Sequence, residues 1–220
     1  MKVAGADVWK GQWVVVVLDD GQFDHAFLSA AIDAAVGQVA DAKVIGIDTP
    51  IGLPEPGKSR PADMQARKYV GRRWQSVFMT PAIDLLLSPS HKEANTLAKA
   101  QGWDGISAQT YALKRTILEV QPVAQRDSRV YEVHPEVSFV RANGGVTLRW
   151  PKSSWNGVAL RRQILHGQGV VVPDDLGEPG AAGVADMLDA AIVAWSAARL
   201  AAGEAESLPD GSDRIGSIWR

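Results

Sequence analysis

Four aspartates stand where their carboxylates could act together. Asp7 and Asp48 each follow a hydrophobic run that is typical of a β-strand. Asp186 and Asp189 are three residues apart in an otherwise apolar helical stretch from Ala181 to Ala202, which places them about 60° apart on the helix surface. Carboxylates gathered in one cleft repel one another unless a hard cation neutralises them, and Mg²⁺ and Mn²⁺ prefer such oxygen ligands.

We therefore predict that Asp7, Asp48, Asp186 and Asp189 bind Mg²⁺ or Mn²⁺ and act in catalysis. Two such ions about 3.5–4 Å apart can activate a water and stabilise the leaving oxygen in phosphodiester cleavage. Each aspartate also has an ordinary interpretation, as a turn former after a strand or as part of a solvated helix edge. Asp follows a predicted β-strand twice, and a pair of Asp residues interrupts an apolar helix. Together these observations favour a metal site over the ordinary interpretation of each residue.

The segment EVHPE forms a second candidate group. Glu132, His134 and Glu136 alternate along a predicted strand end, but Pro135 opens a helix, so at most Glu132 and His134 are expected to converge. His134 could shuttle a proton or contact a phosphate, with Glu136 or Glu132 as an additional acid. Alternatively, His134 caps the helix and Glu136 complements its positive N-terminus. Both interpretations stay open, and His134 and Glu136 join the candidate catalytic residues.

A basic run follows the loop after Asp48 and is the predicted substrate-binding segment. Cationic side chains beside aromatic rings can hold phosphates and stack on bases. The alternative is a solvated helix face, which is the usual position of a charge run. The predicted substrate-binding residues are Arg60, Arg67, Arg72, Arg73 and Trp74.

Regular elements at predictable places would position these residues. The order of three strands, a helix and a fourth strand implies a mixed sheet with a parallel crossover, and hence an α/β protein. We expect a single domain over residues 1–220, with a helical insertion at about 61–127. Ser29 is expected to cap the first helix, which would end near Ala40. Strands are predicted at 2–7, 12–18, 23–28, 43–48 and 129–134, and later helices at 61–70, 107–125, 135–143, 156–166 and 181–202.

Composition narrows the class of protein further. Lys and Arg number 23 against 25 Asp and Glu, a net charge of −2, so no overall basic field would attract nucleic acid and any such contact must be local. The chain has no cysteine, which excludes disulfides, a cysteine nucleophile and thiolate metal sites. No signal peptide or membrane span is recognisable, and we expect a cytoplasmic protein. The oligomeric state is left open.

Six segments in the same order resemble a known family over nearly the whole chain. They are VAGADVWKGQWVVVV near the start, IGIDTPIGLP at 45–54, RPADMQARKYVGRRWQSVFMTP at 60–81, GISAQTYALKRTILEV at 105–120, YEVHPEVSF at 131–139 and ADMLDAAIVAWSAAR at 185–199. The sequence resembles domain-of-unknown-function family 429, a family of predicted nucleases in the ribonuclease H-like superfamily.

The resemblance implies a ribonuclease H-like fold, which is a mixed five-stranded sheet with helices on both faces and further helices inserted between the later strands. In that superfamily the metal-binding acids come from the first strand, a later central strand and the last helix, and Asp7, Asp48, Asp186 and Asp189 occupy the matching places. The function expected is a divalent-metal-dependent nuclease acting on nucleic acid or a nucleotide. The alternatives are a nucleotide-binding phosphotransferase or hydrolase on the same core, and a non-catalytic protein that binds nucleic acid or a nucleotide.

Overall fold

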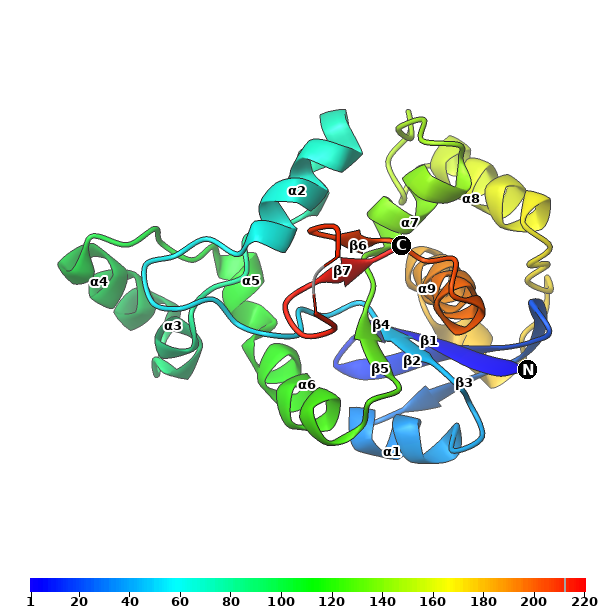
Figure 1. Cartoon of the computed structure of the whole chain (residues 1–220), viewed down its shortest axis with the longest axis horizontal. Coiled ribbons are helices and arrows are strands. Elements are labelled where there is room, and N and C mark those ends of the chain that lie inside the picture. Colours follow the sequence, from blue (N-terminus) through cyan, green and yellow to red (C-terminus); the bar gives the residue numbers. More distant parts are fainter. Residues whose placement is uncertain (212) are drawn as a thin grey trace.

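A computed structural model describes residues 1–211 and 213–220 (Figure 1). In this part of the chain, five strands form one mixed sheet in the order β3-β2-β1-β4-β5. Strands β1 to β3 are antiparallel neighbours, whereas β4 pairs in parallel with β1 on one side and with β5 on the other. The strands are β1 (Lys2–Trp9), β2 (Gln12–Asp19), β3 (Gln22–Ser29), β4 (Ile45–Ile47) and β5 (Val130–Glu132).

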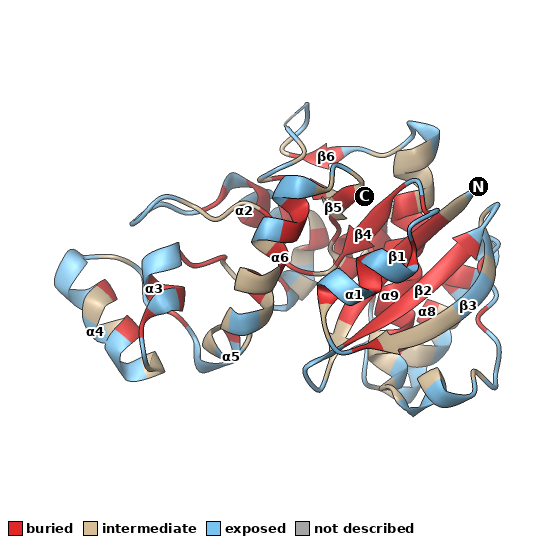
Figure 2. Cartoon of the chain, turned by 90° about the horizontal axis from the view of Figure 1, so that it is seen from below, coloured by how far each residue is buried: buried red, intermediate tan, exposed pale blue. Residues whose placement is uncertain are grey.

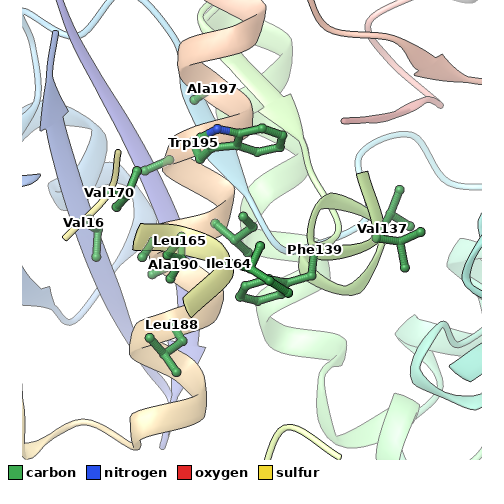
Figure 3. Packing of buried hydrophobic residues seen from close by; sticks show 14 of the residues in the cluster. Val16, Val137, Phe139, Ile164, Leu165, Val170, Leu188, Ala190, Trp195 and Ala197 are labelled. Carbon is green, nitrogen blue, oxygen red and sulfur yellow. The ribbon is translucent and has the colours of Figure 1, made fainter. Parts of the chain in front are cut away.

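Helices cover both faces of the sheet, which confirms the predicted α/β class. One face packs on α9 (Val184–Ala202), with α7 (Pro135–Ala142) and α8 (Trp155–Gly167) behind it, and Figure 3 shows this core around Phe139, Leu165 and Trp195. The other face packs on α1 (Ile32–Gln38) and α6 (Lys114–Arg126). The architecture is the one that a ribonuclease H-like fold is expected to have.

Side chains of β1 point alternately to the two faces of the sheet, so successive residues pack against different helices. Ala4 and Ala6 belong to the core under α1 and α6, whereas Val3 belongs to the core under α9. Gly5 also faces α9, and a Cβ at this position would lie 2.1 Å from the backbone nitrogen of Ala194. Glycine is therefore required for the close approach of β1 and α9.

The longest apolar helix, α9, is buried along most of its length. Its close neighbours are β1, β2 and β4 in the sheet and α7 and α8 on its other side. No helix in the described residues is long and apolar enough to cross a membrane.

Between β4 and β5 the chain forms a series of helices that carry a small core of their own. Leu85, Leu86 and Ile106 are among its buried residues, and Figures 1 and 2 show α3 and α4 extending away from the sheet. The helices of this segment are α2 (Pro61–Val70), the 3₁₀ helix η1 (Gly71–Ser76), α3 (Ile83–Leu87), α4 (His91–Gln101), α5 (Ala108–Ala112) and α6.

The structure departs from the sequence prediction at a few element ends. Ser29 does not cap α1, because its hydroxyl donates to the carbonyl of Ala31, which is the residue that precedes the helix. The helix ends at Gln38 rather than near Ala40. The helical stretch predicted over 107–125 is divided into α5 and α6 at Leu113.

Several short elements were not predicted. They are α3, α4, η1, the 3₁₀ helix η2 (Glu178–Ala181) and a small antiparallel pair, β6 (Ser207–Leu208) and β7 (Ile218–Trp219). The pair β6–β7 lies beside β5 and α2 (Figure 1).

Candidate active site

Asp7 and Asp48 lie side by side at the carboxyl ends of two parallel strands. Ala6 pairs with Ile47, so the next residues in the register are the two aspartates, and the amide of Asp48 donates to the carbonyl of Ala6 at 2.9 Å. Both aspartates come two residues after a glycine that faces α9, Gly5 and Gly46 respectively. Since side chains alternate along a strand, both carboxylates belong to the α9 side of the sheet.

Asp189 joins them from α9. Asp7 is 6% exposed and Asp189 2%, whereas Asp48 is partly buried. All three line one cleft of about 520 Å³, in which Glu132, His134, Glu136, Lys152 and Asp186 also take part. Strand ends and the last helix therefore bring together three of the four acids that the sequence predicts, Asp7, Asp48 and Asp189.

The three carboxylates perturb one another strongly. Burial raises the pKa of Asp7 well above its usual value, and the charges of Asp48 and Asp189 raise it further. Burial raises the pKa of Asp48 to about 8, with the charge of Asp189 as the next cause. The pKa of Asp189 is also raised by burial. A cluster of this kind holds negative charge poorly unless a cation is present.

Lys152 is the cation that meets this cluster. Its Nζ donates to Oδ2 of Asp189 at 2.5 Å, although the side chain is still 47% exposed. The positive charge of Lys152 lowers the pKa of all three aspartates, and they in turn raise the pKa of Lys152, which therefore stays protonated. Sequence reasoning misses Lys152, because no spacing or motif distinguishes it from other lysines.

The donor set fits a divalent cation in chemistry. Carboxylate oxygens are the ligands that Mg²⁺ and Mn²⁺ prefer, and three acids, of which Asp7 and Asp189 are buried and Asp48 is partly buried, face a single lysine charge. Lys152 pairs with Asp189 and balances only one of these charges. The spacing is wider than a metal ion requires, because among the described residues no three His, Asp or Glu side chains converge closely enough to hold one. Asp7, Asp48 and Asp189 are the residues that would hold the ion.

Asp186 lies at the rim of the cleft, apart from the other three. It is partly exposed, and its Oδ2 lies so close to Gly183 that a Cβ there would be 2.3 Å away. Burial raises its pKa and the charge of Lys152 opposes that shift, whereas Asp7, Asp48 and Asp189 are not among the causes. The 60° separation on α9 thus directs Asp189 into the cluster and leaves Asp186 at its edge.

His134 caps α7, as one of the two sequence interpretations expects. Its Nδ1 accepts a hydrogen bond from the amide of Glu136 at 3.2 Å, and burial lowers its pKa. The ring is therefore neutral at pH 7 with its proton on Nε2. It also lines the cleft, where the Nε2–H can donate a hydrogen bond to a ligand while the ring stays uncharged.

The carboxylate of Glu136 forms ion pairs with two arginines. One oxygen accepts from Arg73 Nε at 3.2 Å and the other from Arg161 Nη2 at 2.6 Å. Both arginines also donate to the carbonyl of Trp150, two residues before Lys152. This network fixes the segment that carries Lys152, which gives Glu136 and Arg73 a positioning role.

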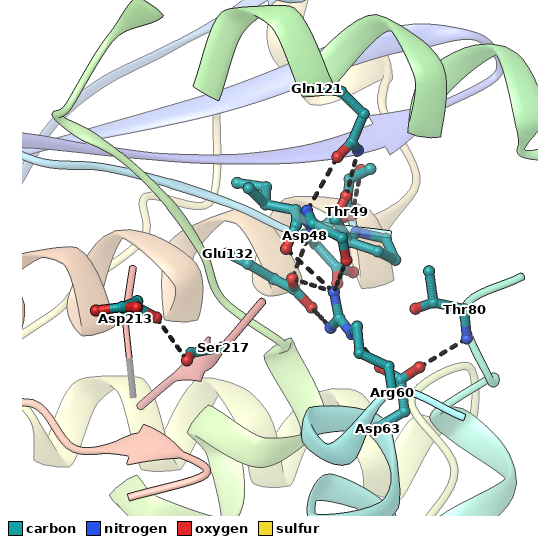
Figure 4. A network of polar contacts seen from close by, with 12 residues as sticks. Asp48, Thr49, Arg60, Asp63, Thr80, Gln121, Glu132, Asp213 and Ser217 are labelled. Carbon is teal, nitrogen blue, oxygen red and sulfur yellow. Dashed lines mark hydrogen bonds and ion pairs between the residues drawn. The ribbon is translucent and has the colours of Figure 1, made fainter. Parts of the chain in front are cut away.

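Arg60 is buried in ion pairs and does not face the cleft as the substrate contact that the sequence predicts. Its guanidinium donates two hydrogen bonds to Glu132, its Nε donates to Asp63 at 3.0 Å, and it is 3% exposed (Figure 4). It also donates to the carbonyls of Ile51 and Gly52. Arg60 is buried because it pairs with Glu132 on β5. Together with its hydrogen bonds to Ile51 and Gly52, this ion pair holds the loop after Asp48 in place.

The other basic residues are divided between the cleft and the surface. Arg67 lines the cleft; its Nε donates to the carbonyl of Val77 at 2.7 Å, and no carboxylate lies within ion-pair distance among the described residues. Its guanidinium stacks on the ring of Trp74, which is 47% exposed outside the cleft. Arg72 is exposed and does not line the cleft. Of the predicted substrate-binding residues, Arg67 alone lines this cleft.

The fold and the site together define an α/β protein with a buried carboxylate cluster at the carboxyl ends of parallel strands. Comparison with protein families places the chain more narrowly. The family described as "Protein of unknown function (DUF429)" matches residues 5–214, and the chain belongs to this family. No curated protein and no solved structure matches the chain.

Proposed function

We propose that the protein is a divalent-metal-dependent phosphodiesterase that acts on nucleic acid or a nucleotide. The observation that carries this proposal is the meeting of Asp7, Asp48 and Asp189 in one cleft, with raised pKa values that call for a cation. When bound there, Mg²⁺ or Mn²⁺ would neutralise phosphate charge and activate a water. The placement of the acids on two parallel strands and the last helix supports the proposed relation to ribonuclease H-like nucleases.

Residues of the chain itself supply the remaining functions. The two Nη nitrogens of Arg67 have no hydrogen-bond partner among the described residues, so they can bind a phosphate in bidentate fashion. Lys152 neutralises Asp189 in this structure, and its flexible ammonium can turn to a substrate phosphate when another cation takes its place on the carboxylate. The neutral His134, which lines the same cleft, can orient a water or a phosphate oxygen through its Nε2–H.

A second candidate function follows from one specific observation. Because Lys152 already neutralises part of the cluster and no three ligands converge on one point among the described residues, the protein could bind nucleic acid or a nucleotide without catalysis. In that case the carboxylates have no catalytic role, and replacement of one of them by asparagine leaves binding and stability intact or improved, because it relieves the repulsion among them.

Hydrolysis assays separate the two functions. Purified protein is incubated with single-stranded DNA, single-stranded RNA and duplex DNA in Mn²⁺, Mg²⁺ or EDTA. We expect metal-dependent cleavage that Asp189→Asn lowers at least a hundredfold. The matched control is Asp174→Asn, because the Asp174 side chain is 97% exposed and outside the cleft. Equal cleavage by the two variants, or a product that forms in EDTA, would overturn the proposal.

A further inference from the structure

A second cavity opens beside the carboxylate cleft and has no role in the function proposed above. It encloses about 230 Å³ between the loop at 57–59, the segment 78–82 and the segment 103–107 of the helical insertion. The two cavities share four wall residues, so they are neighbours along one continuous surface. The shared residues are Arg67, Phe78, Ser107 and Thr110.

The walls of this second cavity combine aromatic and cationic side chains. Trp103 and Phe78 are both partly exposed, and the indole packs on Gly57 so closely that a Cβ there would lie 2.9 Å from the ring. Gly57 has a φ of +74°, which also favours glycine. Lys58 contributes an exposed ammonium that pairs with Glu55, and Arg67 stands at the junction with the cleft.

One buried polar group in this wall lacks a partner. Thr80 is 4% exposed and lines the cavity, yet its hydroxyl has no hydrogen-bond partner among the described residues. Its amide, by contrast, donates to Asp63 at 2.7 Å and fixes the backbone there (Figure 4). A buried hydroxyl without a partner costs free energy, and a ligand that supplies the partner recovers it.

Size and charge restrict what the cavity can take. It is smaller than the roughly 300–1,000 Å³ of typical sites for drug-sized ligands, which leaves room for a single flat group rather than a duplex. Asp104 also lines the wall, and its carboxylate repels phosphate but can accept from the amino group of a base. Aromatic walls stack on any base, and the cation at the junction with the cleft suits a phosphate.

We propose that this cavity binds the base of an unpaired nucleotide next to the scissile phosphate, with Arg67 holding the phosphate that joins the two sites. The inference rests on the proposed function and names its substrate class, which is single-stranded nucleic acid or a strand with an unpaired nucleotide. A paired and stacked base cannot enter a cavity of this size without leaving the helix, and that costs a few kcal/mol.

Binding can be measured without catalysis. Fluorescence anisotropy measures the binding of fluorescein-labelled (dT)8, (rU)8 and a 16-base-pair duplex at low salt. EDTA is present throughout, so that metal-dependent cleavage does not occur. We expect the wild type to bind either single strand at least tenfold more tightly than the duplex. We expect Trp103→Leu to weaken single-strand binding at least fivefold, as loss of one base stack does.

Two further variants test the same cavity with changes that are not expected to disturb folding. Lys58→Ala changes an exposed side chain and Thr80→Val keeps the shape of the wall, and each is expected to weaken single-strand binding two- to fourfold. The matched control for the tryptophan is Trp155→Leu, because Trp155 is 88% exposed and lines neither cavity. Circular dichroism confirms that each variant is folded.

The outcomes distinguish this inference from the proposed function. If the variants of the second cavity bind like the wild type while Asp189→Asn abolishes cleavage, the inference is overturned and the phosphodiesterase stands. If they weaken binding although no cleavage occurs with any metal, the base site stands and the phosphodiesterase is overturned. Equal affinity of the wild type for duplex and single strands also contradicts the inference.

Discussion

Replacement of Asp48 by asparagine should stabilise the metal-free protein at neutral pH. The folded protein raises the pKa of this carboxyl from 3.8 to about 8. Between these values the folded state keeps a proton that the unfolded state releases, so stability falls as the pH rises. Below the lower value both states are protonated and the cost disappears, and above pH 8 the full cost is present.

The size of the effect follows from the same shift. A pH of 7 is about three units above the ordinary pKa of 3.8. At about 1.4 kcal/mol per unit, the raised pKa of Asp48 lowers the free energy of unfolding at pH 7 by about 4 kcal/mol. We expect Asp48→Asn to recover about 2 kcal/mol, because Asp48 is only partly buried and the new amide needs its own hydrogen bonds. For a chain of this length that corresponds to a rise in Tm of roughly 4–8 °C.

Urea and thermal unfolding in EDTA at pH 5 and pH 8 test this prediction. The free energy of unfolding of Asp48→Asn minus that of the wild type should be below about 1 kcal/mol at pH 5 and should grow toward pH 8. Asp174→Asn, on the exposed side chain, should show no such growth. A difference that is the same at both pH values, or a variant less stable than the wild type at pH 8, would refute the reasoning.

Three further substitutions test the elements that position the site. Gly5→Ala should destabilise the fold by about 3 kcal/mol or more, seen in urea unfolding, because its Cβ would overlap the backbone of α9. Lys152→Met should lower the stability of the metal-free protein by about 1 kcal/mol, a modest value since the side chain is half exposed, and calorimetry should show tighter Mn²⁺ binding. Arg60→Met should lower the free energy of unfolding by about 3–5 kcal/mol, measured by thermal unfolding, because Glu132 and Asp63 are left buried without their cation. An unchanged Tm would contradict a stabilising role for these buried ion pairs.

Much of the sheet and part of the site could be predicted because they depend on local pattern. Alternation along a strand and the position of a residue near a strand end are properties of consecutive residues, and they place Asp7 on β1 and Asp48 directly after β4, although β1 continues to Trp9 past its predicted end at Asp7. That β1 and β4 are neighbours follows from the strand order of the sheet, which local pattern does not give. The same holds for α9, where apolar periodicity predicts the helix and the spacing places Asp186 and Asp189 near each other. Which of the two enters the cluster depends on how α9 is rotated against the sheet, and this rotation is a property of the tertiary packing rather than of the spacing.

The remainder of the site depends on partners that are distant in the sequence. Arg60 belongs to a charge run that is typical of a surface, and only its pairing with Glu132, 72 residues away, buries it. Lys152 stands in a loop without regular pattern, and its role becomes visible only when Asp189 is placed beside it. Helix α3 has only five residues, too few to show a period, and the buried positions of α4 are the small residues Ala94 and Ala98, which do not mark an apolar face clearly.

Binding of Mn²⁺ by isothermal titration calorimetry is the most direct test that Asp7, Asp48 and Asp189 form one cation site. Wild type, Asp7→Asn, Asp189→Asn and the control Asp174→Asn are titrated at pH 6 and pH 8. We predict that the wild type and the control bind Mn²⁺, more tightly at pH 8 because the carboxyl groups must lose their protons, and that both cluster variants bind at least tenfold more weakly. Equal binding by all four proteins, or none by the wild type at millimolar metal, would contradict the metal-dependent account.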